Sequence, residues 1–198
     1  MSDLDQALFL LVNASAHPPH AVVLIATLIA KYLILLVPLH LALVWAAGNQ
    51  RMRIIATTAL AALVLALVAN LAIGLVVHNP RPFVVGIGHT FLAHRANSSF
   101  PSDHATVFFT YAAVLMVFGK DGLAVLFGVL GLTVAWSRVY LGIHYPLDMV
   151  GAAVVGALAA SATVWAMRRF GRAPLMASER LHGALMPLLV VTHVVARR

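Results

Sequence analysis

Residues 54–77, IIATTALAALVLALVANLAIGLVV, form a run of 24 positions without a charged side chain. A helix of roughly 20 apolar residues can cross the hydrocarbon core of a bilayer, because each residue adds about 1.5 Å. Four further stretches approach this length and composition, namely 21–47, 101–119, 123–140 and 146–167. The sequence therefore predicts an all-α, polytopic transmembrane bundle with five spans.

The composition of the whole chain also favours a membrane protein. Of the 198 residues, 62% are hydrophobic and 10% are charged, whereas soluble domains have about half apolar and about a quarter charged residues. Sparse charge and the absence of heptad spacing exclude a disordered chain and a coiled coil. The chain has no cysteine, which excludes disulfides and thiolate metal sites. No internal repeat or linker divides residues 1–198, so we expect a single domain.

The two ends of the chain carry shorter apolar runs. Residues 8–12 are too few to span a bilayer and lack the basic leader of a signal peptide, so we expect an interfacial helix there. Residues 184–195 are also few, and they include Pro187 and His193. A partial span over 184–195 would make the count five or six.

The formal net charge of +7 comes mostly from short basic clusters between apolar runs. This pattern argues against nucleic-acid binding and for orientation in a membrane, because short cytoplasmic loops are enriched in Lys and Arg. A five-span arrangement puts the clusters on one side: Arg51 with Arg53, Lys120, and Arg168 with Arg169 and Arg172. The other side carries the amino terminus, the link 78–100 and the turn 142–145. Arg81, Arg95 and Arg138 lie on that outer side against the rule, which indicates that a ligand needs them.

The segment Ser137–Asp148, SRVYLGIHYPLD, places a polar cluster between two predicted helices. Pro146 suits the first turn of a helix, so His144 precedes this helix and Asp148 lies in its first turn. At this spacing the carboxylate can reach one ring nitrogen and leave the other free, as in an oriented nucleophile or base. A purely structural pair at a helix entrance is the alternative.

A second motif, SSFPSDH, occupies residues 98–104. Ser98 or Ser99 can cap a helix that has Pro101 in its first turn, and the free backbone N–H groups of that turn would bind an anion. His104 is placed to donate a proton to a departing oxygen. Simple helix capping is the alternative.

A third motif, HNPRPF, occupies residues 78–83. The prolines on both sides of Arg81 fix the backbone, so its guanidinium presents several donors to an oxyanion at low entropic cost. Taken alone, this arginine could instead contact a lipid headgroup. Together the three motifs bring two arginines, two histidines, a carboxylate and a helix amino terminus to one face. Phosphoryl binding and transfer explain that combination.

The order of these motifs resembles the phosphatidic-acid phosphatase type 2 superfamily of integral-membrane phosphatases. R-P, then P-S-x-H, then S-R-x5-H-x3-D look like the three signature motifs of that family. The residues found in these motifs are similar to those of the bacitracin-resistance type of undecaprenyl-diphosphate phosphatase; they are P-R-P-F, S-S-F-P-S-D-H-A and S-R-V-Y-L-G-I-H-Y-P-L-D. The motifs cover residues 78–148, and the apolar pattern extends the likeness over most of the chain.

The resemblance implies that His144 attacks the terminal phosphorus of a lipid diphosphate and becomes a phosphohistidine, with Asp148 orienting it. His104 would protonate the leaving lipid phosphate, and water would then hydrolyse the intermediate without a metal or another cofactor. The candidate phosphate-binding residues are Arg81, Arg138, Ser102, Asp103, Ser137 and Lys31.

The resemblance further implies a bacterial inner-membrane enzyme that hydrolyses undecaprenyl diphosphate on the outer face, as in the recycling of peptidoglycan precursor lipids. Other enzymes of the same class act on phosphatidic acid, phosphatidylglycerol phosphate or lipid A, or pass the phosphoryl group to another lipid. A lipid-phosphate carrier without turnover would explain the spans and the arginines but would give the histidines no role. The expected partners are the polyprenyl diphosphate and membrane lipids, and the sequence does not determine the oligomeric state.

One position departs from the family pattern. Many members carry a lysine seven residues before the arginine of the first motif, and Gly74 stands there in this chain. We hypothesise that Lys31, inside the first span, reaches the phosphoryl site instead; the alternative is a lysine that snorkels or contacts water. Asn70 is a weaker candidate and fits better as an interhelical hydrogen-bonding residue. We expect His40 to be a hydrogen-bonded packing residue.

The remaining histidines carry less weight. Those in or near the outer loop, which could contact a diphosphate together with Arg95, are His78, His89 and His94. Their spacing is not a metal-ligand motif. Those expected to be interfacial or structural are His17, His20, His182 and His193.

Overall fold

The computed structural model describes the backbone of residues 3–195 and the side chains of residues 3–171 and 173–187. Every regular element in this part of the chain is a helix. The elements are α1 (Asp3–Val12), α2 (His20–Tyr32), the short 3₁₀ helix η1 (Leu33–Leu35), α3 (Leu36–Ala47), α4 (Gln50–Val76), α5 (Asp103–Val117), α6 (Asp121–Tyr140), α7 (Pro146–Phe170) and α8 (Arg172–Val195). The predicted helical membrane bundle is confirmed.

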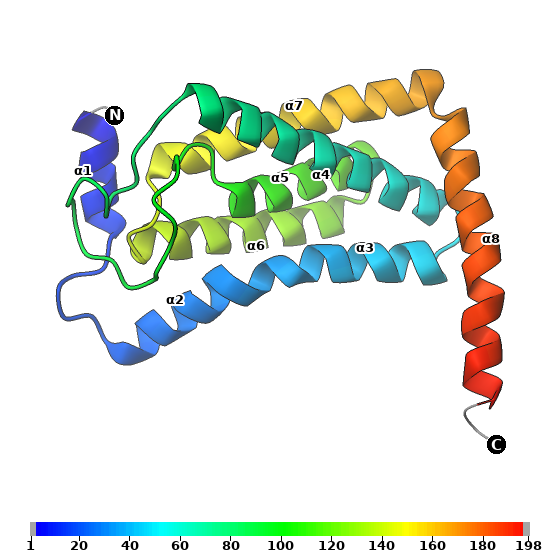
Figure 1. Cartoon of the computed structure of the whole chain (residues 1–198), viewed down its shortest axis with the longest axis horizontal. Coiled ribbons are helices and arrows are strands. Elements are labelled where there is room, and N and C mark those ends of the chain that lie inside the picture. The colour runs from blue at the N-terminus through cyan, green and yellow to red at the C-terminus, as the bar shows by residue number, and fades with distance from the viewer. Residues whose placement is uncertain (1–2, 196–198) are drawn as a thin grey trace.

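Most of the long helices run side by side, with α5 among them (Figure 1). Within the described part of the chain, four stretches are long and apolar enough to cross a membrane: His20–Ala47, Gln50–Val76, Asp121–Tyr140 and Pro146–Phe170. The remaining predicted span, 101–119, corresponds to α5. It is shorter than expected, because residues 101 and 102 still belong to a loop and α5 has 15 residues. It is the most enclosed helix, and its buried side chains include Phe108, Tyr111 and Leu115.

The first span is interrupted near its middle. Pro38 has no backbone N–H to donate to the carbonyl of Ile34, and its ring crowds the preceding turn. The chain upstream of this proline tightens into η1, so α2 and α3 meet at a short 3₁₀ segment. The carboxyl-terminal part of α2 packs against α6, and it faces the motif that contains Arg138.

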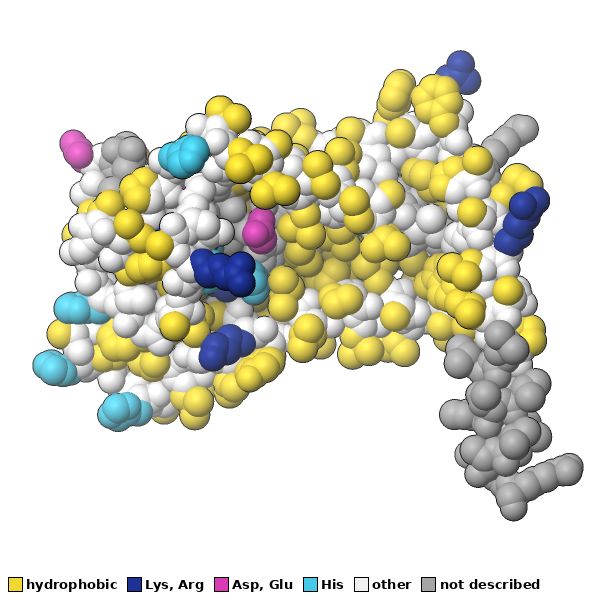
Figure 2. All heavy atoms as spheres, viewed as in Figure 1, with side chains coloured by type: hydrophobic (Ala, Val, Ile, Leu, Met, Phe, Trp, Pro, Cys, Tyr) yellow, Lys and Arg dark blue, Asp and Glu magenta, His cyan; other side chains and the backbone are white. Residues whose placement is uncertain are grey.

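The loops divide between two ends of the bundle. We call the end with α1, the loop 77–102 and the loop 141–145 the outer end, and the opposite end the inner end (Figure 1). The start of α4, the turn between α5 and α6 and the end of α7 all lie at the inner end, so the predicted placement of the basic clusters on one side is confirmed. Between the two ends, Figure 2 shows a broad hydrophobic surface on the visible face.

Helix α8 differs from the partial span expected over 184–195. It runs across the inner end of the bundle instead of alongside the other helices (Figure 1), and it is not among the four candidate spans. Its first half is held by side chains of α3 and α4. Glu179 pairs with Arg53, and Ser178 bonds both Trp45 and Thr57. These polar contacts keep α8 at the surface of the inner end.

Candidate active site

His144 lies in the tight loop between α6 and α7. Gly142 has a φ of +80°, and a Cβ atom there would collide with the carbonyl of His89, so this turn requires glycine. Pro146 starts α7, as the sequence predicted. The loop thus delivers His144 to the outer end of the bundle, where its side chain is 2% exposed.

Asp148 orients the His144 ring. Its Oδ2 lies 3.0 Å from Nδ1 of His144 and also accepts the backbone N–H of Tyr145 at 2.9 Å. Its Oδ1 accepts a hydrogen bond from the Ser99 hydroxyl at 3.3 Å. The predicted contact between this carboxylate and one ring nitrogen is therefore confirmed, and three donors fix the carboxylate in place.

The second ring nitrogen of His144 is not free, contrary to the sequence prediction. Nη1 of Arg81 lies 3.0 Å from Nε2. A guanidinium can only donate, so Nε2 carries a lone pair and the proton sits on Nδ1, facing Asp148. Burial, with the charges of Arg138 and Arg81, lowers the pKa of His144 well below its ordinary value. A buried nitrogen in this setting needs a partner, and Arg81 supplies one while keeping the imidazole neutral.

Arg81 is held by acceptors on two loops. Nη1 also donates to the carbonyl of Ile143 at 2.8 Å, Nη2 donates to the carbonyl of Ser98 at 3.2 Å, and Nε donates to the side chain of Asn97 at 3.1 Å. The residue is 4% exposed. Because two of its acceptors are backbone carbonyls, a side-chain motif could not reveal them. Asn97, directly before the second motif, was also missed.

Arg138 lies in the last turn of α6 and is 3% exposed. Its Nη1 donates to the carbonyl of Ala30 in α2 at 3.4 Å, and its Nη2 lies 3.1 Å from Nε2 of His94 in the outer loop. Nε has no hydrogen-bond partner among the described residues. Neither Arg81 nor Arg138 makes an ion pair with a carboxylate in that part of the chain, so buried positive charge remains for an anion to balance.

The amino terminus of α5 completes the cluster. Helix α5 begins after Ser102, and no side chain caps its first turn. The prediction that Ser98 or Ser99 caps this helix is wrong, because the Ser98 hydroxyl donates to the carbonyl of Val77 and the Ser99 hydroxyl to Asp148. The Ser102 hydroxyl is fully buried and has no partner among the described residues. An anion could therefore be bound by this hydroxyl and by the free N–H groups of the turn.

His104 lies in the same first turn of α5. After burial, the charges of Arg138 and Arg81 lower the pKa of His144, and a positive charge on His94 or His104 would act in the same direction. The three sequence motifs thus form one electrostatically connected cluster of arginines, histidines and a carboxylate at the outer end. Such a cluster can bind a phosphoryl group and offer it a neutral imidazole with an available lone pair.

A family model described as the PAP2 superfamily matches residues 55–172, which is more than half of the chain. The chain belongs to the PAP2 superfamily. It is 39% identical over 168 residues to the YbjG protein of Escherichia coli (strain K12), covering 83% of this chain and 84% of that one. It is 32% identical over 152 residues to undecaprenyl-diphosphatase BcrC of Bacillus subtilis (strain 168), covering 77% and 78%.

The fold of this PAP2 protein is also similar to a solved structure. The crystal structure of Aquifex aeolicus LpxE superposes with a TM-score of 0.68 at 24% sequence identity, covering 82% of this chain and 96% of that one. The two chains therefore share this helical fold.

Among the residues that the structure describes, three of the candidate phosphate-binding side chains in this PAP2 protein have other hydrogen-bond partners or none. The Ser137 hydroxyl donates to the carbonyl of Val134 at 2.7 Å. The Asp103 carboxylate is exposed and accepts a hydrogen bond from Asn70 at 2.9 Å, so only its backbone N–H could serve an anion. Lys31 is exposed, next to the Ala30 carbonyl that receives Arg138. Their roles in phosphate binding stay predictions.

The position of the missing PAP2 lysine lies beside the outer loop. A Cβ atom on Gly74 would come 3.8 Å from both Phe100 and Ser98, in ordinary contact. Asn70, one turn earlier on α4, donates to Asp103 and to Thr106 of α5 at 2.9 and 3.0 Å. The expectation that Asn70 is an interhelical hydrogen-bonding residue is confirmed.

One further expectation concerns a histidine outside the motifs. His40 hydrogen-bonds the Tyr111 hydroxyl at 2.6 Å, which confirms a hydrogen-bonded packing role.

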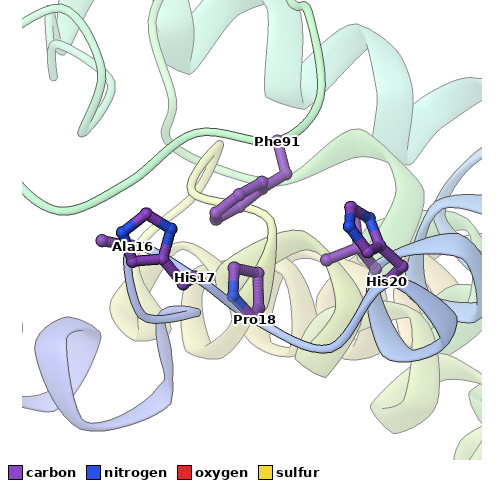
Figure 3. A pocket seen from close by; sticks show the side chains of 6 residues that line it. Ala16, His17, Pro18, His20 and Phe91 are labelled. Carbon is purple, nitrogen blue, oxygen red and sulfur yellow. The ribbon is translucent and has the colours of Figure 1, made fainter.

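A cavity of about 430 Å³ lies at the outer rim, lined by Ala16, His17, Pro18, His20, Val23 and Phe91. Figure 3 shows Phe91 reaching from the outer loop toward Pro18 and His17. None of these residues belongs to the three motifs, and no cluster of metal-binding type occurs among the described residues.

Helix α1 supports the site from outside. Its Asp5 carboxylate accepts the backbone N–H of Leu147 in the first turn of α7, and the Phe9 ring packs edge-on against Tyr145. Just after this helix, the Asn13 side chain bonds the backbone of both His89 and Tyr140. The short helix predicted to be interfacial is therefore packed against the loop that carries the nucleophile candidate.

Proposed function

We propose that this protein is a lipid phosphatase that hydrolyses undecaprenyl diphosphate to undecaprenyl phosphate and phosphate. The arrangement of His144 carries the proposal: one ring nitrogen is fixed by Asp148, and the other holds a lone pair beside Arg81 and near Arg138. The likeness to undecaprenyl-diphosphatase BcrC over 77% of the chain supports the substrate. A membrane bundle suits this substrate because its polyprenyl tail stays in the lipid.

The first chemical step is displacement at the terminal phosphorus. As the phosphoryl group binds, the Arg81 N–H turns from Nε2 of His144 to a phosphoryl oxygen, which frees the nitrogen lone pair. Nε2 forms a bond to phosphorus while the bond from phosphorus to the bridging oxygen breaks. His104 gives its proton to that oxygen, and undecaprenyl phosphate leaves.

The second step releases phosphate. Water gives a proton to His104 and attacks the phosphohistidine, and the phosphorus–nitrogen bond breaks as its electron pair returns to Nε2. Arg81, Arg138, the Ser102 hydroxyl and the free N–H groups of α5 stabilise the charge that develops on the phosphoryl oxygens in both steps. Each well-aimed donor of this kind contributes roughly 3 to 4 kcal/mol.

The charge distribution supports a location for the reaction. The basic clusters lie at the inner end, and cytoplasmic loops are enriched in such residues. We therefore place the outer end, with the site, on the extracytoplasmic face of a bacterial inner membrane.

The direct test measures phosphate release from purified protein with undecaprenyl diphosphate and a chelator. The parent protein should turn over, and His144→Ala should lose at least about 1,000-fold in rate while it still binds the lipid. His20→Ala, a change of an exposed histidine outside the motifs, is the matched control. If the parent protein binds the lipid but does not turn it over, the proposed phosphatase function is wrong and the protein is a lipid-phosphate carrier.

The substrate is tested by a side-by-side comparison of undecaprenyl diphosphate, phosphatidic acid and phosphatidylglycerol phosphate. We expect the diphosphate to be preferred by at least about tenfold in kcat/KM, which is roughly 1.4 kcal/mol of transition-state binding. Equal rates on all three lipids would instead show a phosphatase of broad specificity.

A further inference from the structure

His94 is a side chain of the outer loop that enters the cluster without belonging to any of the three motifs. Its Nε2 lies 3.1 Å from Nη2 of Arg138, and its ring lies edge-on to the ring of His144 with the centroids 6.2 Å apart. The neighbouring Arg95 side chain is exposed, whereas His94 is half-buried. The loop thus directs this imidazole toward the reacting groups.

The hydrogen bonds fix the protonation state of His94. The guanidinium of Arg138 can only donate, so Nε2 of His94 is the acceptor and Nδ1 carries the proton. Nδ1 lies 3.1 Å from the carbonyl of Arg95, which accepts that proton's hydrogen bond. Burial lowers the pKa of His94, and the charges of Arg81 and Arg138 lower it further. In the free protein this imidazole is neutral and occupies one donor of Arg138.

A bound phosphoryl group would change the partners of His94. Anionic oxygens compete for Arg138, and the negative charge they bring favours a proton on Nε2 of His94. The protonated ring would then donate Nε2–H to an oxygen of the substrate. His94, a neutral acceptor for Arg138 in the free protein, thereby becomes a donor to the ligand, and it takes up one proton from solvent.

Distance assigns this donor to one part of a diphosphate. A phosphorus in position for attack lies roughly 3 to 3.5 Å from the nucleophilic nitrogen. The His94 ring is not in contact with that nitrogen's ring, because the two ring centroids are 6.2 Å apart, which leaves room for a phosphoryl group between them. In an in-line displacement the leaving group lies beyond the phosphorus. An imidazole at the range of His94 therefore suits the second, lipid-side phosphate, while Arg81 and Arg138 serve the phosphoryl group under attack.

We propose that His94 determines specificity by binding the lipid-side phosphate of a diphosphate, so that the site favours diphosphate over monophosphate lipids. This inference rests on the proposed function, because it requires that a phosphoryl group binds between His144 and Arg138. It adds a residue that the sequence motifs do not contain and a reason for the preference for diphosphates.

The test compares two lipids that differ by one phosphate, farnesyl diphosphate and farnesyl phosphate. In His94→Ala we expect kcat/KM for the diphosphate to fall at least about tenfold and that for the monophosphate less than about threefold. His94→Gln, which keeps an N–H donor, should recover part of the lost preference. His17→Ala, a change of an exposed histidine at the same end of the molecule, should leave both values unchanged.

A second measurement does not need turnover. Calorimetric titrations with methylenediphosphonate and with inorganic phosphate should show that His94→Ala weakens binding of the diphosphonate at least about tenfold and that of phosphate less than about threefold. Equal losses for both ligands, no loss, or tighter binding in the variant would overturn the assignment. If the parent protein turns over neither lipid and binds neither anion, the proposed function itself is wrong, and the variant plays no part in that conclusion.

Discussion

The inner and outer ends of the bundle treat their arginines differently. At the inner end, Arg53 binds both carboxylate oxygens of Glu179 at 2.8 and 2.9 Å, and the two side chains are 15% and 34% exposed. At the outer end, Arg81 and Arg138 are more deeply buried, yet they donate to backbone carbonyls, to Asn97 and to histidines. Among the described residues, Arg53 at the inner end thus has a carboxylate partner, whereas the two buried arginines at the outer end have none.

This difference indicates what each end is for. The charge of a paired surface arginine is already balanced by its carboxylate, and such pairs contribute little to the free energy of folding. A buried arginine without a carboxylate partner is costly unless an anion completes its shell. The outer end is therefore built around a ligand, whereas the inner end is built around a contact between helices. The following predictions separate the two ends, beginning with the largest effect.

Asp148→Asn should abolish most of the activity of the outer site. The amide keeps the size of the side chain, but it has one oxygen acceptor where the carboxylate has two, so the proton on Nδ1 of His144 loses its partner or the ring reverses. Phosphate release should fall by roughly 1,000-fold or more. Glu179→Gln makes the same chemical change at the inner end and should leave the rate within about twofold. A loss of similar size in both variants would mean that the two ends do not differ in function.

Arg138→Ala removes one of the two buried arginines at the outer end. Turnover should fall by at least about 100-fold, as expected for a donor aimed at developing charge. Arg138→Lys should recover only part of the rate, because an ammonium is a point charge without the planar fork. Arg53→Lys is the matched change at the inner end, and its turnover should match that of the parent. Full activity in Arg138→Lys would show that the site needs charge alone.

The dependence of stability on pH should also differ between the ends. Burial lowers the pKa of His144 in the folded protein, so the unfolded chain binds more protons below pH 6.5 and stability falls as the pH decreases. His144→Gln removes this linkage, so its thermal midpoint should fall less steeply from pH 6.5 to 5. The difference amounts to at most about tenfold in the folded-to-unfolded ratio per pH unit.

The inner pair provides the contrast in this experiment. The hydrogen bond from Arg53 lowers the pKa of Glu179, so that carboxylate stays ionised over the same range and its contribution is lost only in stronger acid. Glu179→Gln should therefore leave the slope between pH 6.5 and 5 unchanged. Parallel curves for His144→Gln and the parent would contradict a buried neutral imidazole.

Ser178→Ala should have the smallest effect on turnover. This serine joins α8 to Trp45 and Thr57 through two hydrogen bonds of 2.9 Å at the inner end. Losing them should lower the thermal midpoint by the equivalent of about 1 kcal/mol, while the rate of phosphate release changes less than about twofold. A large loss of activity would show that the inner contact is coupled to the outer site.

The apolar pattern predicted the long helices well. The run 54–77 corresponds to α4 (Gln50–Val76), and 146–167 corresponds to α7 (Pro146–Phe170). The contact of Asp148 with His144 also followed from their spacing and from Pro146. These features depend on residues close in sequence, so local patterns were sufficient to predict them.

Features that depend on distant residues were harder to predict. Ser99 can cap a helix by type, but in the folded protein its hydroxyl donates to Asp148, 49 positions away. The partner of the second His144 nitrogen is Arg81, from another motif. The direction of α8 depends on Glu179 and Ser178 meeting α3 and α4. In each case a polar group has several possible partners, and tertiary packing selects one.

The hydrogen bond from Arg81 to His144 has a consequence for inhibitors. Reagents that acylate or alkylate histidine need an accessible lone pair, and here a guanidinium covers that of His144, whose side chain is 2% exposed. A neutral electrophile should therefore label His17 or His20 and spare the nucleophile. A covalent inhibitor of this protein would need an oxyanion that first draws Arg81 aside, so that its own charge uncovers the atom it is meant to capture.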